Sequence, residues 1–79
     1  MYASFRQLRL FLALVETGSV SGAARRTHVT QPTASMQLKE LSEHIGEPLF
    51  EVISKKVHLT YAGERLAKSA RAMFDEWQL

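Results

Sequence analysis

The segment Ser19–Ile45, SVSGAARRTHVTQPTASMQLKELSEHI, decides the fold of this 79-residue chain. Its first part is rich in small residues, and its second part is amphipathic and opens on hydroxyl and amide side chains. A three-residue break separates the two parts, so the segment predicts a helix-turn-helix at about residues 19–38. In this motif the second helix enters the DNA major groove and needs small polar groups at its exposed start. A helical hairpin without a ligand is the alternative that the segment leaves open.

The second helix of this segment has one apolar side and one polar side. At about 100° per residue, one arc contains Ala34, Leu38, Leu41 and Ile45. The opposite arc contains Pro32, Met36, Lys39 and Glu43, flanked by Thr33 and Ser35. Thr30 is the expected N-cap, and Gly46 is expected to end the helix in a left-handed conformation. In the preceding helix, Ser19 or Ser21 can serve as the cap.

The rest of the chain predicts one helix before this segment, and a hairpin and a helix after it. The first helix is expected from about Phe5 to Glu16, with a capping box between Ser4 and Gln7 and an apolar stripe that includes Phe5. The segment from Leu49 to Thr60 predicts a small β-hairpin with its tip at Ser54–Lys56. The tip lacks Gly, Asn and Asp, which leaves the register of the hairpin open.

From Thr60 onward the chain is predicted to be helical, with a long apolar stripe. The stripe consists of Leu66, Ala70, Met73 and Trp77, and Phe74 lies beside it. Such a stripe has to be covered, and we expect either that the helix folds back on the domain or that it pairs with a second chain. A short chain buries a small share of its surface, so association with a second copy would add stability.

Charge is distributed unevenly along the chain, although the net charge is only +2. Residues 1–39 and 55–71 are mainly basic, whereas residues 40–51 contain glutamates and no lysine or arginine. Separate basic zones favour a surface that meets phosphate groups at more than one place, although an ordinary solvated surface has the same appearance. The absence of cysteine excludes a disulfide framework and is compatible with a cytoplasmic location. No apolar run has the length of a membrane span.

Nothing in the sequence indicates catalysis, a metal site or a cofactor. His28, His44 and His58 lie far apart and share no ligand spacing with one another. No serine occupies a nucleophile elbow, and no glycine-rich phosphate loop is present. We therefore expect a protein that is not an enzyme.

Taken together, the residues resemble the N-terminal DNA-binding domain of LysR-type transcriptional regulators. The resemblance rests on the order and spacing of Arg6-Gln7-Leu8, Gly18-Ser19-Val20, Ala23-Ala24, Val29-Thr30-Gln31-Pro32, Gly46-Glu47-Pro48-Leu49-Phe50-Glu51, Leu59-Thr60 and Ala62-Gly63. It implies a mainly α fold, a winged helix-turn-helix at residues 4–61 with a three-helix core and a β-hairpin wing, and a linker or dimerisation helix at residues 62–79. It also implies an inverted-repeat operator, a homodimer or a tetramer, and a C-terminal domain outside this chain that senses a small-molecule effector.

The residues expected to contact DNA lie at the start of the second motif helix, just before it, and at the hairpin tip. They are Thr30, Gln31, Pro32, Thr33, Ser35, Met36 and Lys39, then Arg25 and Arg26, and finally Lys55 and Lys56. The expected dimer interface consists of Leu66, Ala70, Met73, Phe74 and Trp77.

Some positions depart from the pattern of the family. Arginine is common where Val52 and Met36 stand, and frequent where His58 stands. Two other functions therefore remain open. One is the related winged-helix domain of molybdate-type regulators, and the other is a dimerisation or protein-interaction module that has lost its DNA contacts.

Overall fold

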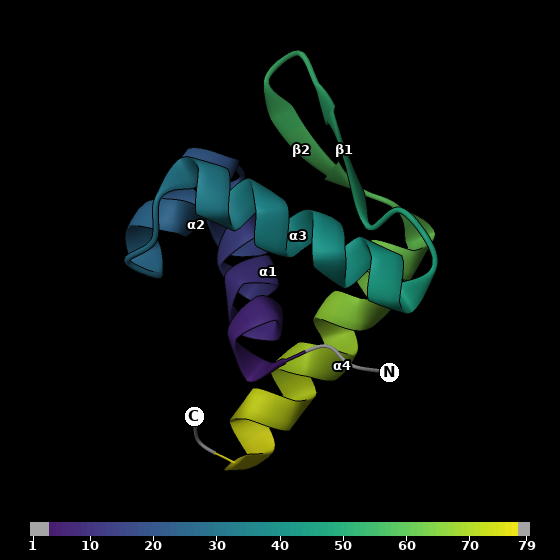
Figure 1. Ribbon diagram of the computed structural model, residues 1–79. Coiled ribbons are helices and arrows are strands. Elements are labelled where there is room, and N and C mark those ends of the chain that lie inside the picture. The colour runs from purple at the N-terminus through teal and green to yellow at the C-terminus, as the bar shows by residue number, and fades with distance from the viewer. Residues whose placement is uncertain (1–3, 78–79) are drawn as a thin grey trace.

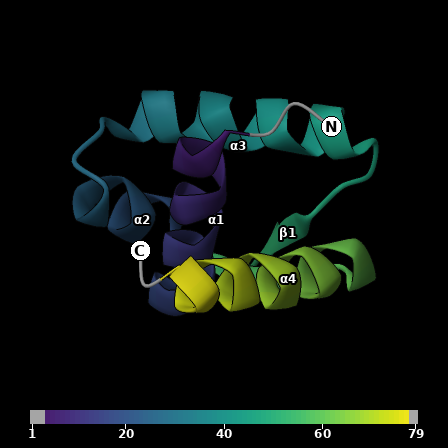
Figure 2. The same ribbon diagram turned by 90° about the horizontal axis from the view of Figure 1, so that it is seen from below.

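The computed structural model describes residues 4–77, which form four helices and one β-hairpin. In chain order the elements are α1 (Phe5–Thr17), α2 (Val20–Arg26), α3 (Gln31–Ile45), β1 (Phe50–Ile53), β2 (Lys56–Leu59) and α4 (Tyr61–Trp77). Helix α1 lies between α3 and α4, and the hairpin projects beyond α3 (Figures 1 and 2). This arrangement is the expected winged helix-turn-helix with a long C-terminal helix.

Helix α1 begins at the predicted capping box. The backbone N–H of Gln7 donates to Ser4 Oγ (3.2 Å), and the N–H of Ser4 donates to Gln7 Oε1 (3.4 Å). The helix ends at Gly18, whose φ of 78° is left-handed. The prediction that Phe5 belongs to the core stripe is wrong, because its side chain is 57% exposed. It lies at the first position of the helix, beyond the core, and its ring contacts only the edge of the domain, 5.9 Å from the ring of Phe74.

The turn between α2 and α3 is tight and contains no glycine. Ser19 caps α2, as its Oγ accepts from the N–H of Gly22 (3.0 Å). After Thr27, His28 takes a left-handed φ of 61°, and the N–H of Val29 returns to the carbonyl of Ala24 (3.0 Å). This bond reverses the chain immediately after α2. The small side chains of α2 are buried, so α2 can pack closely against its neighbours.

Helix α3 has the predicted ends and the predicted buried side. The N–H of Thr33 donates to Thr30 Oγ1 (3.2 Å), and Gly46 ends the helix at a φ of 87°. The side chains of Ala34, Leu38 and Leu41 are buried, and Ile45 is half-buried against the same core.

The wing is an antiparallel hairpin with a two-residue turn. Ile53 pairs with Lys56, and Ser54 and Lys55 both have positive φ, of 50° and 65°. Two consecutive left-handed residues give the strand twist that suits a two-residue hairpin, here without the usual glycine or asparagine. The predicted tip was one residue too long, because Lys56 belongs to β2. At the base of the hairpin, Phe50 and its partner Leu59 pack against the core.

Helix α4 folds back on the domain and packs against α1. Its Ala67, Ala70 and Phe74 side chains are buried. Thr60 fixes the start of the helix, since its Oγ1 donates to the carbonyl of Pro48 (2.7 Å) and accepts from the N–H of Gly63 (3.1 Å). Within residues 4–77, no helix is both long and apolar enough to cross a bilayer.

The folding of α4 changes the expected dimer interface. Ala70 and Phe74 are buried by their own chain, so they are not available to a partner in this conformation. Leu66 and Met73 are half-buried, and Trp77 is 71% exposed. The two alternatives for the apolar stripe are folding back on the domain and pairing with a second chain. Folding back covers Ala70 and Phe74, and it leaves Leu66, Met73 and Trp77 as an accessible edge of α4.

Candidate nucleic-acid interface

The start of α3 forms an exposed polar surface supported by an apolar core. Six of the seven residues predicted there are exposed, namely Thr30, Gln31, Pro32, Ser35, Met36 and Lys39, and Thr33 is half-buried. Pro32, Met36 and Lys39 lie opposite to the buried residues of α3, flanked by Thr33 and Ser35, and Thr30 and Gln31 lie at the start of the helix. The fold therefore brings this part of the predicted set together on one short stretch of helix.

The hydrogen bonds at this helix start settle which side chain is the cap. The hydroxyl of Thr30 accepts from the N–H of Thr33 and donates to the hydroxyl of Thr33 (2.9 Å). Thr30 is thus occupied by capping, whereas the side-chain amide of Gln31 has no partner within residues 4–77. Thr30 is therefore the cap, and Gln31 is free of that role. Its amide is available as a donor and an acceptor.

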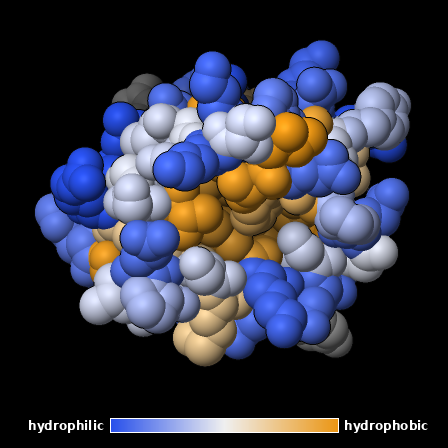
Figure 3. Space-filling view, turned by 90° about the horizontal axis from the view of Figure 1, so that it is seen from above, coloured by the Kyte–Doolittle hydropathy of each residue, from blue (hydrophilic) through white to orange (hydrophobic). Residues whose placement is uncertain are grey.

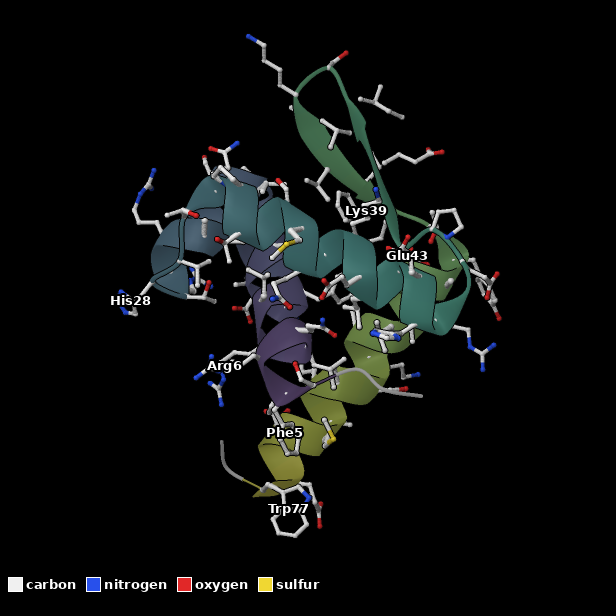
Figure 4. All side chains as sticks on the ribbon, in the orientation of Figure 1. Phe5, Arg6, His28, Lys39, Glu43 and Trp77 are labelled. Atoms are coloured by element: carbon white, nitrogen blue, oxygen red, sulfur yellow. The ribbon has the colours of Figure 1, made fainter. Side chains whose placement is uncertain are left out.

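Charge along the exposed side of α3 limits how the helix can approach an anion. Lys39 and Glu43 are both exposed and lie about one turn apart on α3 (Figure 4). The C-terminal half continues into the acidic zone of residues 40–51. A polyanion is therefore favoured at the N-terminal half of α3, which contains no carboxylate and has the positive end of the helix dipole, and is repelled by the glutamates of the C-terminal half.

The two arginines at the end of α2 differ in their surroundings. Arg25 is exposed and has no ion-pair partner among residues 4–77. Arg26 Nη1 lies 2.7 Å from Glu16 Oε1, and Arg71 Nη2 is 3.9 Å from the other oxygen of the same carboxylate. Much of the charge of Arg26 is therefore compensated by α1, and Arg25 is the better placed of the pair to attract phosphate.

The wing combines lysines with exposed apolar residues. Lys55 and Lys56 are exposed at and beside the turn. Val52 is 58% exposed and pairs with Val57, so its side chain lies outside the core. Seen from the side to which the hairpin projects, the molecule has an apolar hollow near its centre, surrounded by polar side chains (Figure 3). Met36 of α3, with 50% exposure, adds a further exposed apolar side chain next to the polar start of the helix.

One residue with a part in this surface was not recognised from the sequence. Gln7 was predicted only as a partner in the capping box, yet its side chain is buried and also reaches α3. Its Nε2 donates to Gln37 Oε1 (2.9 Å) and to Glu40 Oε2 (3.3 Å). The signal in the sequence was weak, because a glutamine between the apolar residues of an amphipathic helix is usually a solvated boundary residue.

No cluster of three or more potential metal-ligating residues exists in the part of the chain that the structure describes. The exposed set at the start of α3 is also free of paired carboxylates or a nucleophile with a base beside it. Its chemistry is that of hydrogen bonding and charge.

Comparison with known proteins agrees with this geometry. The model of the lysR family of bacterial regulatory helix-turn-helix proteins matches residues 5–64. The HTH-type transcriptional regulator TfdS of Cupriavidus pinatubonensis is 45% identical over 71 residues, which cover 90% of this chain and 24% of the relative. MetR of Haemophilus influenzae is 49% identical over 69 residues, which cover 87% of this chain and 22% of the relative. The chain thus spans about a quarter of the length of the curated relatives it matches.

Two solved structures have the same fold at appreciable identity. The crystal structure of a CbnR DBD–DNA complex matches with a TM-score of 0.87 and 35% identity, over 95% of this chain and 86% of that chain. The complex of the BenM DBD with catB site 1 DNA matches with a TM-score of 0.89 and 32% identity, over 95% and 84%. With the family match over most of its length, the chain belongs to the LysR family of bacterial helix-turn-helix regulatory proteins.

Proposed function

We propose that this chain is the sequence-specific DNA-binding domain of a bacterial transcriptional regulator and inserts the start of α3 into the major groove. The observation that carries the proposal is the exposed start of α3, where a capped helix end presents unpartnered polar side chains above a buried apolar side. The relatives CbnR and BenM, solved as complexes of their DBD with DNA, support it.

The residues of this surface offer three kinds of contact to DNA, which are hydrogen bonds, apolar contacts and charge. The free amide of Gln31 can bond adenine at two edge atoms, and the hydroxyls of Thr33 and Ser35 can reach bases or phosphates. Pro32 and Met36 can contact the methyl group of thymine, because they are the apolar members of the exposed arc. Arg25, Lys39, Lys55 and Lys56 supply the phosphate contacts, which fix register without reading sequence.

A dimer follows from the small size of one recognition helix. One such helix covers a few base pairs, so useful specificity requires two half-sites, and a two-fold protein implies an inverted repeat. We assign the accessible edge of α4, formed by Leu66, Met73 and Trp77, to the contact between two copies. Trp77 and Phe5 lie at the same end of the molecule (Figure 4), so these two exposed aromatic side chains are available to one partner.

The remaining proposals concern a longer protein, since this chain spans about a quarter of the length of its curated relatives. We assign residues 4–61 to the winged domain and residues 62–77 to the linker or dimerisation helix, whose last two predicted residues, 78 and 79, lie outside the described part of the chain. A C-terminal effector-binding domain and assembly into a homodimer or tetramer belong to the same proposal, as does action in the cytoplasm. The relatives are transcriptional regulators, so a regulatory role rather than an enzymatic one is expected here.

Selection of binding sites from random duplex DNA tests the function. The chain should enrich one sequence motif containing two inverted half-sites. A variant with Gln31→Ala and Ser35→Ala should lose this motif, whereas Ser69→Ala on the exposed side of α4 should keep it. The second candidate, a protein-interaction module, is favoured by the exposed Met36 and Val52 at positions where arginine is common. Self-association of the chain with no enriched motif would establish that candidate and exclude DNA recognition.

A further inference from the structure

Gln7 is the buried polar residue among residues 4–77, with 6% of its surface exposed. It lies on α1 and is not one of the residues assigned to DNA contact. A buried amide requires partners for its hydrogen-bonding groups, because an unpaired one lowers stability. Its partners show which helices it joins.

The amide of Gln7 is fully engaged and has one orientation. Its Oε1 accepts from the N–H of Ser4 (3.4 Å), while Nε2 donates to Gln37 Oε1 (2.9 Å) and Glu40 Oε2 (3.3 Å). Since a carboxylate only accepts, the amino group has to face α3 and the oxygen has to face the cap of α1. The group Gln7–Gln37–Glu40, here named the α1–α3 junction, therefore connects the start of one helix to the middle of the other.

The α1–α3 junction differs in kind from the apolar contacts around it. Apolar packing of Ala34 and Leu38 has little directionality, so by itself it allows small rotations of α3 about its axis. Hydrogen bonds depend steeply on angle, and those to a carboxylate are the stronger ones. The junction thus determines the rotation of α3, and with it the direction in which Gln31 and Ser35 project from the preceding turns.

We propose that Gln7 is a positioning residue for DNA sequence recognition, which fixes the rotation of α3 through Gln37 and Glu40. This inference rests on the proposed function. None of its three residues belongs to the set assigned to DNA contact, and each is buried or half-buried, so their effect on specificity is indirect. Loss of the junction should lower discrimination between sequences more than it lowers general affinity for DNA, because three of the four phosphate-contacting residues, Arg25, Lys55 and Lys56, lie outside α3.

The substitution Gln7→Glu isolates the junction from the cap. A glutamate at this position still completes a capping box with Ser4, so the start of α1 is preserved. Its second oxygen would face the carboxylate of Glu40, about where Nε2 now donates, and repel it. The double variant with Gln7→Glu and Glu40→Gln exchanges amide and carboxylate. It restores the junction once the amide of Gln37 turns over to donate.

The matched control is Ser4→Ala, which removes the cap while leaving the bonds of Gln7 to α3 in place. It should lower the melting temperature without altering sequence preference. Comparing Ser4→Ala with Gln7→Glu separates loss of stability from loss of positioning. All measurements are made at a temperature at which circular dichroism shows each variant to be fully folded.

The readout is the ratio of affinities for the duplex selected by the wild-type chain and for a scrambled duplex. We expect Gln7→Glu to lower this ratio about tenfold, the size of one hydrogen bond to a charged group, and the double variant to recover it. An unchanged ratio in folded Gln7→Glu, or an equal fall in Ser4→Ala, overturns the inference while leaving the proposed function intact. Failure of the wild-type chain to select any duplex overturns the proposed function itself.

Discussion

Replacing Gly63 by alanine tests how closely α4 approaches the loop before the wing. A methyl group at this position would collide with the backbone carbonyl oxygen of Leu49, with the carbonyl carbon 3.0 Å away. That oxygen accepts a hydrogen bond from the N–H of Thr60 (3.1 Å), and the side chain of Leu49 is fully buried. The added methyl group of residue 63 and the carbonyl of Leu49 both belong to or adjoin the backbone, which cannot move aside like a flexible side chain. The start of α4 therefore has to shift.

The expected loss follows from three contributions. Overpacking in a well-packed region costs about 1–3 kcal/mol, and weakening the bond to Leu49 costs about 1 kcal/mol. Alanine recovers up to about 1 kcal/mol of helix propensity. The net destabilisation is about 2 kcal/mol, which corresponds to a melting temperature lower by about 10 °C for a domain of this size. Gly63 has an ordinary helical backbone, so no strain in φ contributes.

Thermal unfolding followed by circular dichroism at 222 nm measures this effect. The matched control is Ser69→Ala, an exposed position on the same helix, which should leave the melting temperature unchanged or slightly raised. An unchanged or increased melting temperature for Gly63→Ala would refute the close contact between α4 and Leu49.

Three further outcomes are expected. Val52→Arg should steepen the slope of log affinity against log salt by about 0.9, the effect of one added phosphate contact. The melting temperature should not change, because Val52 is exposed. An unchanged slope with a lowered melting temperature would reject the contact between the wing and DNA. Trp77→Ala should weaken self-association measured by sedimentation, and a wild-type chain that stays monomeric at high concentration would remove the assigned interface. Gln31→Ala should relax base preference at one position of each half-site, and retention of the wild-type motif would show that Gln31 does not read a base.

The helix boundaries and the core of α3 could be predicted because local chemistry determines them. Capping by Ser4 and Thr30, and termination at Gly46, depend on residues within one turn of each helix end. The buried side of α3 follows from its period of 3.6 residues. These signals are contained in short windows of sequence, and each was confirmed.

Features that depend on contacts between distant segments could not be predicted. Helical periodicity placed Phe5 in the core, but this first residue of α1 contacts only the ring of Phe74 at the edge of the domain and stays 57% exposed. The role of Gln7 depends on Gln37, which is 30 residues away. The hairpin turn required two positive φ values at Ser54 and Lys55, which their residue types do not signal. Whether the stripe of α4 faces its own domain or a partner was likewise a matter of tertiary packing.

The central claim is that Gln31, at the start of α3, reads a base edge in the major groove. The direct measurement compares affinities for the selected duplex and for duplexes in which each adenine in turn is replaced by 7-deazaadenine, which lacks the N7 acceptor. We expect a loss of about fivefold at one adenine per half-site, roughly half of a bidentate contact, and we expect this loss to disappear in Gln31→Ala. The same loss in the wild-type chain and in Gln31→Ala would contradict it.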